Sequence, residues 1–387
     1  MRSPSRWRAP AVRRRRRDVD RVNLAFLIGH FPPGPFGGAE LQAEGWARRL
    51  SDRHRIIVIT RRDPPDQPAR QSRDGFEIVR LPAPRLPLWR TVADVAGIGR
   101  AVRAIAPRPD VLLCFQTFVS GLAGVRVGRR LGIPTAVWIR GEGEYQLDRS
   151  RGQRWIGPRV WDGAAAVLVQ SLQNQVELLE QLERHAPARL GRVRSHLHVV
   201  ANGLDLPAAA PGGGTRVLSV GRLIRDKGMD VVIDAAAAAG LPLTVAGEGP
   251  EREPLEARAR AAGLDCRFEG YASRERLEEL YREASCVVLA ARRGEGLPNV
   301  LLEAMARARP VIATPCAGVR DLVADSVTGL LVPFDDPGAL AHALTRVARD
   351  PDLAVRLGRE ARRAVERFGW ERVEPALEQV LARIARA

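Results

Sequence analysis

The chain has very little lysine, few aromatic residues and few cysteines. One lysine, Lys227, stands among 60 arginines, and aromatic side chains make up 5% of the 387 residues. The four cysteines form no C-x-x-C pair and have no histidine cluster beside them, which argues against a disulfide framework or a zinc site and indicates buried thiols. No apolar run approaches the roughly 20 residues needed to cross a bilayer, and no apolar segment of a secretory signal follows the basic N-terminus. We therefore expect a cytoplasmic protein, either soluble or peripheral on the inner face of the cell membrane.

The positive charge is unevenly distributed along the chain. The formal net charge is +16, of which residues 1–17 contribute +8, residues 18–205 another +8, and residues 206–387 none. A basic surface attracts anionic lipid, nucleic acid or an acidic acceptor. Because the chain has no helix-turn-helix or RRM signature and few aromatic residues, we expect no specific nucleic-acid partner. An anionic membrane surface remains as a candidate partner of the N-terminal half. The candidate membrane-binding segments are the Arg13–Arg17 run, a predicted amphipathic helix at 85–106 that contains Trp89, and residues 151–161, where Trp155 and Trp161 stand among arginines.

Short apolar runs alternate with helical stretches in two series, which is typical of parallel sheets covered on both faces. We therefore predict an α/β fold with two Rossmann-like βαβ domains. The expected segments are a disordered basic tail at 1–20, an N-terminal domain at 21–205, a linker at 206–215, a C-terminal domain at 216–369 and a final helix at 370–387 that packs back on the N-terminal domain. The predicted strands are 22–29, 56–60, 76–81, 110–115, 135–139, 165–170, 198–200, 216–220, 243–247, 266–270, 286–290, 310–314 and 329–333.

The segment GEGLPNVLLEAM, residues 294–305, carries two glutamates separated by seven residues. Glu295 lies in a Gly-rich loop after a predicted strand, and Glu303 lies about a turn and a half into the helix that follows. The N-terminus of a helix attracts phosphate, and two carboxylates beside it can accept hydrogen bonds from sugar and ribose hydroxyls. The alternative is a pair of surface glutamates at a spacing that is common by chance.

A second motif, VGRLIRDKG at 220–228, follows a strand and leads into a helix. Arg222 and Lys227 are placed to hold a diphosphate. Because every other basic residue is arginine, the single lysine suggests a need for a compact ammonium group rather than a planar guanidinium. The alternative is a solvated loop lysine.

Weaker signals come from glycines and turns. In FPPGPFGGAE, residues 31–40, Gly37 and Gly38 open a helix, so backbone N–H groups face a phosphate or the cleft. Gly247 ends a strand and either admits a ligand or forms a plain turn. The segment NGLD, 202–205, lies at a hinge between the domains or at an ordinary strand end. Asp18 and Asp20 form an Asp-x-Asp pair, but they precede the first strand, so we predict no metal site.

These motifs, in this order, resemble those of the large family 4 of retaining glycosyltransferases, whose fold is GT-B. The similar segments are FPP…GGAE, VGRLIRDKG and EGLPNVLLEAMARARPVIAT, and the likeness extends over about residues 22–370. The resemblance implies that the N-terminal domain binds the acceptor and the C-terminal domain binds a nucleotide-diphosphate sugar. By position, it implies diphosphate ligands at Arg222 and Lys227, a ribose ligand at Glu303, and a donor-sugar contact at Glu295. It also implies that Gly38 lies beside the diphosphate and that the Gly270–Tyr271 turn lies near the base. We further expect Gly37, Gly247, Gly296 and Leu297 to contact the donor.

One position departs from the family pattern. Many members carry a histidine after the strand that corresponds to TAVWI, at the sugar and acceptor site, whereas this chain has Arg140 followed by Gly141. Arg140 and Glu142 are therefore the expected acceptor-side residues, with Glu144 as a further candidate.

The expected activity is transfer of a hexosyl group, with retention of configuration and without a metal or cofactor. The acceptor is expected to be a glycan or lipid-linked intermediate of cell-envelope polysaccharide synthesis. The diphosphate leaving group takes the acceptor proton, while Arg222 and Lys227 stabilise its charge and Glu295 orients the sugar. Three alternatives stay open: a GT-B nucleotide-sugar epimerase, a donor-binding pseudoenzyme and a nucleic-acid binder without catalytic activity.

Overall fold

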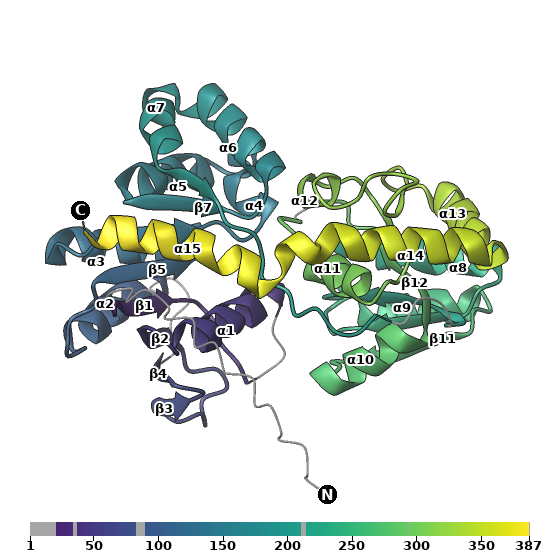
Figure 1. The fold of residues 1–387 in the computed structure, drawn as a ribbon, viewed down its shortest axis with the longest axis horizontal. Coiled ribbons are helices and arrows are strands. Elements are labelled where there is room, and N and C mark those ends of the chain that lie inside the picture. Colours follow the sequence, from purple (N-terminus) through teal and green to yellow (C-terminus); the bar gives the residue numbers. More distant parts are fainter. Residues whose placement is uncertain (1–20, 34–36, 83–89, 210–213, 294, 387) are drawn as a thin grey trace, which may run out of the picture.

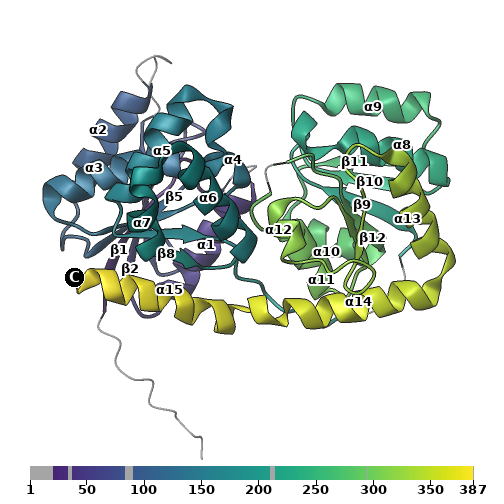
Figure 2. The same ribbon diagram turned by 90° about the horizontal axis from the view of Figure 1, so that it is seen from above.

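Two sheets, each with helices on both faces, lie side by side in a computed structural model of the chain (Figures 1 and 2). The structure describes residues 21–33, 37–82, 90–209, 214–293 and 295–386. The predicted basic tail, the Asp18–Asp20 pair, the centre of the predicted linker, and Trp89 lie outside these residues.

The N-terminal sheet has eight strands in the order β3-β4-β2-β1-β5-β6-β7-β8. All neighbours are parallel except β3 and β4. The strands are β1 (Asn23–Leu27), β2 (Arg55–Arg61), β3 (Arg70–Arg73), β4 (Phe76–Leu81), β5 (Val111–Phe115), β6 (Thr135–Trp138), β7 (Ala166–Val169) and β8 (Leu197–Val199).

The C-terminal sheet has six parallel strands in the order β11-β10-β9-β12-β13-β14. They are β9 (Arg216–Val220), β10 (Leu243–Ala246), β11 (Cys266–Gly270), β12 (Ala284–Leu289), β13 (Val311–Ala313) and β14 (Leu330–Leu331). With two parallel-sheet α/β units, the predicted fold class is confirmed.

Helices fill the connections between strands. In the N-terminal half they are α1 (Gly38–Leu50), α2 (Arg90–Arg103), α3 (Leu122–Leu131), α4 (Glu142–Tyr145), α5 (Arg151–Gly163), α6 (Leu172–His185) and α7 (Pro187–Ser195). In the C-terminal half they are α8 (Met229–Ala239), α9 (Arg252–Ala261), α10 (Arg274–Glu283), α11 (Asn299–Ala306), α12 (Ala317–Arg320), α13 (Pro337–Arg349), α14 (Pro351–Val365) and α15 (Trp370–Ala385).

The central strands are continuous apolar runs because helices cover both of their faces. Every residue of β5, β6 and β7 is buried. Each sheet separates two hydrophobic clusters, one on each face, so each half of the chain has its own core.

The chain passes between the two halves twice, first near Leu204 and again near Trp370. Backbone hydrogen bonds join these two passages. Leu204 donates its N–H to the carbonyl of Phe368 at 2.9 Å, and Trp370 donates to the carbonyl of Leu204 at 3.3 Å. From Trp370, α15 runs back along the N-terminal half, as Figure 1 shows in yellow. Its apolar stripe, including Leu377, joins the N-terminal core, and the Trp370 ring lies 5.0 Å from that of Trp46.

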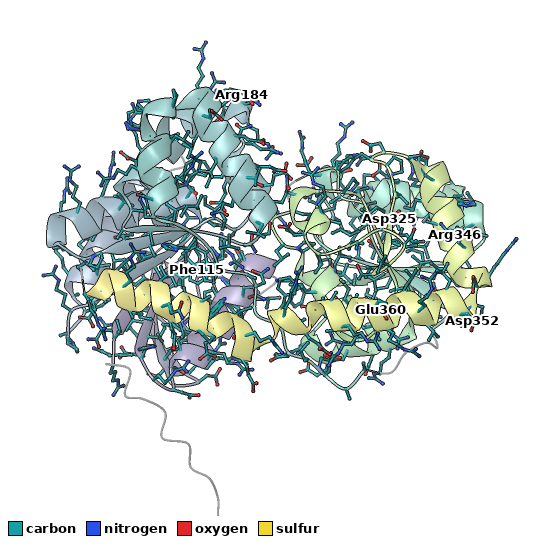
Figure 3. The ribbon with its side chains drawn as sticks, turned by 45° about the horizontal axis from the view of Figure 1, so that its top comes forward. Phe115, Arg184, Asp325, Arg346, Asp352 and Glu360 are labelled. Atoms are coloured by element: carbon teal, nitrogen blue, oxygen red, sulfur yellow. The ribbon has the colours of Figure 1, made fainter. Side chains whose placement is uncertain are left out.

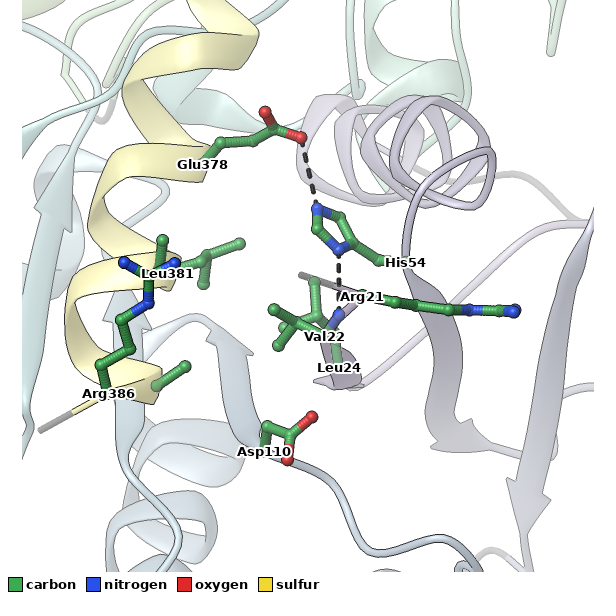
Figure 4. A pocket seen from close by; sticks show the side chains of 10 residues that line it. Arg21, Val22, Leu24, His54, Asp110, Glu378, Leu381 and Arg386 are labelled. Atoms are coloured by element: carbon green, nitrogen blue, oxygen red, sulfur yellow. Dashed lines mark hydrogen bonds and ion pairs between the residues drawn. The ribbon is translucent and has the colours of Figure 1, made fainter. Parts of the chain in front are cut away.

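A polar contact joins the middle of α15 to the amino edge of the sheet. His54 accepts the N–H of Val22 at 3.3 Å and lies 3.3 Å from a carboxylate oxygen of Glu378 (Figure 4). These residues line a cavity of about 180 Å³. In parallel α/β sheets ligands bind at the opposite, carboxyl edge, so this cavity is not the candidate active site.

The structure differs from the sequence prediction at two places. Strand β3 was not predicted, because its sequence RQSR is polar and it pairs antiparallel at the sheet edge. Trp161, which the sequence placed among arginines in a candidate membrane-binding segment, is fully buried and donates its indole N–H to the Thr117 hydroxyl at 3.1 Å. Among the helices that the structure describes, none is both long and apolar enough to cross a membrane.

Candidate active site

The predicted site residues lie mainly on loops that follow the carboxyl ends of strands. In each sheet the strand order reverses next to one strand, β1 in the N-terminal sheet and β9 in the C-terminal sheet. Ligands of open α/β sheets bind at such switch points. Gly37 and Gly38 follow β1, Lys227 follows β9, and Glu295 follows β12, which is the neighbour of β9.

The Lys227 loop is a short helical turn that packs against the end of β12. Gly228 follows it with φ +63°, and a Cβ atom there would lie 2.0 Å from the carbonyl oxygen of Ala290, so only glycine fits. The Lys227 ammonium group forms an ion pair with the carboxylate of Glu295. The sequence prediction assigned these two residues to different ligand groups, and the structure places them in direct contact.

Ion pairs hold the Lys227 loop against the Glu295 loop. Arg292 donates to both carboxylate oxygens of Asp230, at 2.9 and 2.8 Å, and its backbone N–H donates to the carbonyl of Asp226 at 2.9 Å. These contacts lower the pKa of Asp230 against the opposing effect of its burial. The contacts of Arg292 with Asp230 and Asp226 therefore fix the position of the Lys227 loop relative to the Glu295 loop.

Glu303 lies on α11, the helix that follows the Glu295 loop. Its carboxylate accepts a hydrogen bond from the Tyr281 hydroxyl at 2.8 Å. Burial raises the pKa of Glu303, and the Tyr281 hydrogen bond and the charge of Arg307 oppose that shift. Tyr281 thus fixes one carboxylate oxygen of Glu303, which is a suitable arrangement for accepting a ribose hydroxyl with the other.

Two glycines allow the N-terminal half to approach the Glu295 loop. The Asn299 amide donates to the carbonyl of Gly38 at 3.0 Å, and a Cβ atom on Gly38 would lie 2.6 Å from that amide nitrogen. A Cβ atom on Gly296 would lie 2.2 Å from the side-chain oxygen of Gln170. A side chain at either glycine would therefore separate the two halves of the site.

Arg140, at the end of β6, is buried between aromatic rings. Its guanidinium carbon lies 4.8 Å from the Trp138 ring centroid and 5.9 Å from that of Phe115. One guanidinium nitrogen donates to the Asn202 side chain at 2.7 Å, while Nε and Nη1 are buried and have no hydrogen-bond partner among the residues that the structure describes. Burial lowers the pKa of Arg140 to about 10. A buried cation with unused donors is costly, and such groups gather at functional sites.

The two acceptor-side glutamates have different surroundings. Both oxygens of Glu144 accept backbone N–H groups, from Arg140 at 2.7 Å and Thr117 at 2.5 Å, so Glu144 shapes the loop. Glu142 is buried, and its carboxylate accepts a hydrogen bond from the side-chain amide of Gln146. Burial raises the pKa of the Cys316 thiol to about 12, with smaller raising contributions from the charges of Glu295 and Glu142.

In the part of the chain that the structure describes, no hydrogen bond or ion pair joins three other predicted residues to Lys227, Glu295 or Arg140. Arg222 is exposed and makes no ion pair with the described residues, and Tyr271 is also exposed. Gly247 is required by close backbone packing, because a Cβ atom there would lie 1.9 Å from the carbonyl oxygen of Gly221. Within the described part of the chain, no three His, Cys, Asp or Glu residues form a group that could hold a metal ion.

The sequence prediction missed several residues of the site. They are the neutral amides Gln42, Gln170 and Asn299, and Tyr281, which fixes Glu303. Asn202 was noted only within the segment NGLD, as part of a hinge between the domains or of a turn at a strand end, and without a role for its side chain. An uncharged amide has no sequence pattern of its own, so only the tertiary structure identifies these residues.

Two family models match consecutive parts of the chain. The model described as Glycosyl transferase 4-like domain matches residues 37–203, and the model described as Glycosyl transferases group 1 matches residues 207–364. The boundary between the matches lies at the first passage between the two halves.

Similar proteins extend over most of the chain. A D-inositol 3-phosphate glycosyltransferase of Nocardiopsis dassonvillei is 29% identical, covering 88% of each chain. A GDP-mannose-dependent alpha-mannosyltransferase of Mycobacterium tuberculosis is 27% identical, covering 75% of this chain and 79% of the other.

Solved structures share the fold. Sucrose-phosphate synthase of Thermosynechococcus elongatus superimposes with a TM-score of 0.80 at 22% identity, covering 94% of this chain and 99% of the other. HepE of Anabaena, in complex with UDP and glucose, superimposes with a TM-score of 0.76 at 18% identity, covering 94% of this chain and all of the other. Together with the site geometry and the paired family matches, these likenesses establish that the chain belongs to glycosyltransferase family 4 and has the GT-B fold.

Proposed function

We propose that this glycosyltransferase moves a hexosyl group from a nucleotide-diphosphate sugar to an acceptor, with retention of configuration and without a metal ion. The observation that carries the proposal is the pairing of Lys227 with Glu295 beside α11, which also bears Glu303. This pairing supports a cation for a diphosphate and a carboxylate for a sugar beside the N-terminus of a helix, which binds phosphate favourably, and Glu303 on the same helix supplies a carboxylate for a ribose. HepE has been solved with UDP-glucose, which supports a donor of this class.

In the proposed reaction, the diphosphate leaves as the acceptor hydroxyl attacks the same face of the anomeric carbon. The hydroxyl proton passes to a departing phosphate oxygen. Lys227 exchanges Glu295 for the diphosphate and stabilises the charge that develops on it. Arg222, which has no ion-pair partner among the described residues, adds a second cation. The released Glu295 carboxylate accepts hydrogen bonds from the donor sugar and orients it.

On the acceptor side, we assign Arg140 and Glu142. Two donors of Arg140 are buried without a partner among the described residues, and an oxygen of the acceptor or the donor sugar that reached them would satisfy them. Glu142 lies in the same connection after β6 as Arg140, which is why we assign it to the acceptor side as well. The relatives act on different acceptors, as the names D-inositol 3-phosphate glycosyltransferase and Alpha-D-kanosaminyltransferase indicate, and we propose a glycan or lipid-linked intermediate of cell-envelope synthesis.

The donor proposal is tested by melting temperatures measured with a panel of UDP-, GDP- and ADP-sugars. A ligand at 100 times its Kd adds about 2.7 kcal/mol to the stability of the folded state. This corresponds to a rise of roughly 5 to 10 °C for a domain of this size. We expect sugars of one base to raise the melting temperature and the others to have little effect. No shift with any of them would contradict the proposed donor class.

We further propose that the N-terminal domain docks on an anionic membrane. On α5, Trp155 is 57% exposed and stacks with Arg159 at 4.4 Å, and Arg151 and Arg154 beside it are exposed. Helix α7 packs against α5 and adds exposed arginines. This arrangement, an aromatic side chain among cations, suits a headgroup layer.

The docking surface predicts a salt-sensitive interaction with vesicles. Each basic residue near the surface contributes about 1 kcal/mol, so the variant Arg151→Glu/Arg154→Glu should bind anionic vesicles at least ~10-fold more weakly in co-sedimentation at low salt. Matched changes at Arg346 and Arg349 on α13, in the other domain, should have little effect. In Figure 3 the label Arg184, on α6, marks the N-terminal domain, and the label Arg346, on α13, marks the C-terminal domain. Equal binding by all three proteins would contradict the proposed surface.

A further inference from the structure

The side chain of Asn202 lies in the first passage between the domains and is 1% exposed. Its oxygen accepts from Arg140 at 2.7 Å and from Gln170 at 2.8 Å, at the ends of β6 and β7. Its nitrogen donates to the carbonyl of Leu297 at 2.9 Å and to the side chain of Asn299 at 2.8 Å. One amide therefore makes four hydrogen bonds, two to each domain.

The orientation of this amide is determined by its partners. A guanidinium group only donates and a backbone carbonyl only accepts. The Asn202 oxygen must therefore face Arg140, and its nitrogen must face Leu297. Because Leu297 follows Glu295 and Gly296 directly, the amide joins the proposed donor-sugar loop to the proposed acceptor-side arginine.

Neighbouring amides extend the same connection. The Gln42 side chain forms two hydrogen bonds with the backbone of Gly203, at 2.8 and 2.9 Å, and a weaker one with Asn299 at 3.3 Å. Asn299 in turn donates to Gly38 at 3.0 Å. These contacts tie the glycine loop after β1, the interdomain passage and the donor loop into one network.

We infer that Asn202 is a positioning residue, which holds the two domains closed so that the donor loop and Arg140 face the same substrate. The inference rests on the proposed function for its catalytic consequence, but not for its structural one. Asn202 donates to the C-terminal domain and accepts from the N-terminal domain, so closure depends on the chemical difference between the two ends of its amide.

The substitution Asn202→Asp separates this role from simple packing. Aspartate has nearly the same shape, but its second oxygen faces the carbonyl of Leu297 and the side-chain oxygen of Asn299, so both contacts to the C-terminal domain become repulsive. The contacts to the N-terminal domain improve, because the buried Arg140 guanidinium gains a carboxylate partner. The variant should therefore stay folded and lose closure.

The experiment measures small-angle scattering, melting temperature and kinetics for the full chain. Scattering is recorded with and without the nucleoside diphosphate selected by the donor panel. We expect Asn202→Asp to have a larger radius of gyration than the wild type, with a melting temperature equal to or above the wild-type value. Turnover should fall about 100-fold, with a smaller change in donor KM, as expected for a misplaced reacting group. Asn202→Ala should show the same opening with a lower melting temperature.

The matched control is Asn174→Asp, because Asn174 is a buried amide whose side chain bonds to Tyr145 within the N-terminal domain. It should lower the melting temperature without opening the molecule. The inference is overturned if Asn202→Asp scatters like the wild type, whatever its turnover. Because scattering requires no acceptor and no catalysis, this outcome is distinct from a failure of the donor panel.

Discussion

Replacing Lys227 by alanine should lower turnover by about 100- to 1,000-fold and leave the protein folded. The loss corresponds to removal of one preorganised group that stabilises charge in the transition state. The Lys227 side chain is partly exposed, belongs to no hydrophobic core and forms an ion pair with Glu295, whose loop contacts the N-terminal half. Activity is measured in EDTA, in which the wild type should remain active because its cations are side chains.

The variant Lys227→Arg tests why the chain keeps its single lysine. A planar guanidinium group is bulkier than an ammonium group and has fixed donor directions, so this variant should also lose most activity. Arg258→Ala serves as a control, because Arg258 forms an ion pair with Asp234 away from the cleft. A fully active Lys227→Arg variant would show that the ammonium group is not required.

Replacing Glu295 by alanine should lower turnover by about 100-fold without weakening the binding of the nucleoside diphosphate. The loss of turnover follows from a donor sugar that is no longer oriented. Binding is preserved because Glu295 pairs with the Lys227 ammonium group and thus competes with the diphosphate for it. Affinity should therefore stay level or rise.

Kinetics and calorimetry on the same protein separate the two effects. Glu256→Ala provides a control, since Glu256 is a partly buried carboxylate paired with Arg252 on α9. Near-normal turnover in Glu295→Ala would exclude the sugar-orienting role. A loss of nucleotide affinity as large as the loss of turnover would exclude the competition between Glu295 and the diphosphate.

The sequence predicted most of the fold because its signals are local. Apolar runs marked every strand that helices cover on both faces, and three of them, at 76–81, 216–220 and 266–270, have the bounds found in the structure. Strand β3 was missed because it is polar and exists through pairing with β4. The burial of Trp161 was missed because it depends on a hydrogen bond to Thr117, 44 positions away in the chain.

The charged and glycine residues of the site could be predicted, but their connections could not. Lys227 and Glu295 belong to separate motifs, and their ion pair arises only because β9 and β12 are neighbours in the sheet. The amide network joins Asn202 to residues that are more than 90 positions away in the chain, namely Leu297 and Asn299. Neutral side chains in distant segments produce no periodic pattern, so their contacts emerge only after folding.

The most direct test of nucleotide binding at α11 is a calorimetric titration of wild type and Glu303→Ala with the nucleoside diphosphate that the donor panel selects. Loss of a hydrogen bond to a charged group costs about 1.5 to 3 kcal/mol, so the Kd should rise by roughly 10- to 100-fold. In Tyr281→Phe the carboxylate remains and only its hydrogen bond of 2.8 Å is lost, so a smaller rise is expected. An unchanged Kd in Glu303→Ala would contradict the placement of the ribose, and with it the donor site proposed for this glycosyltransferase.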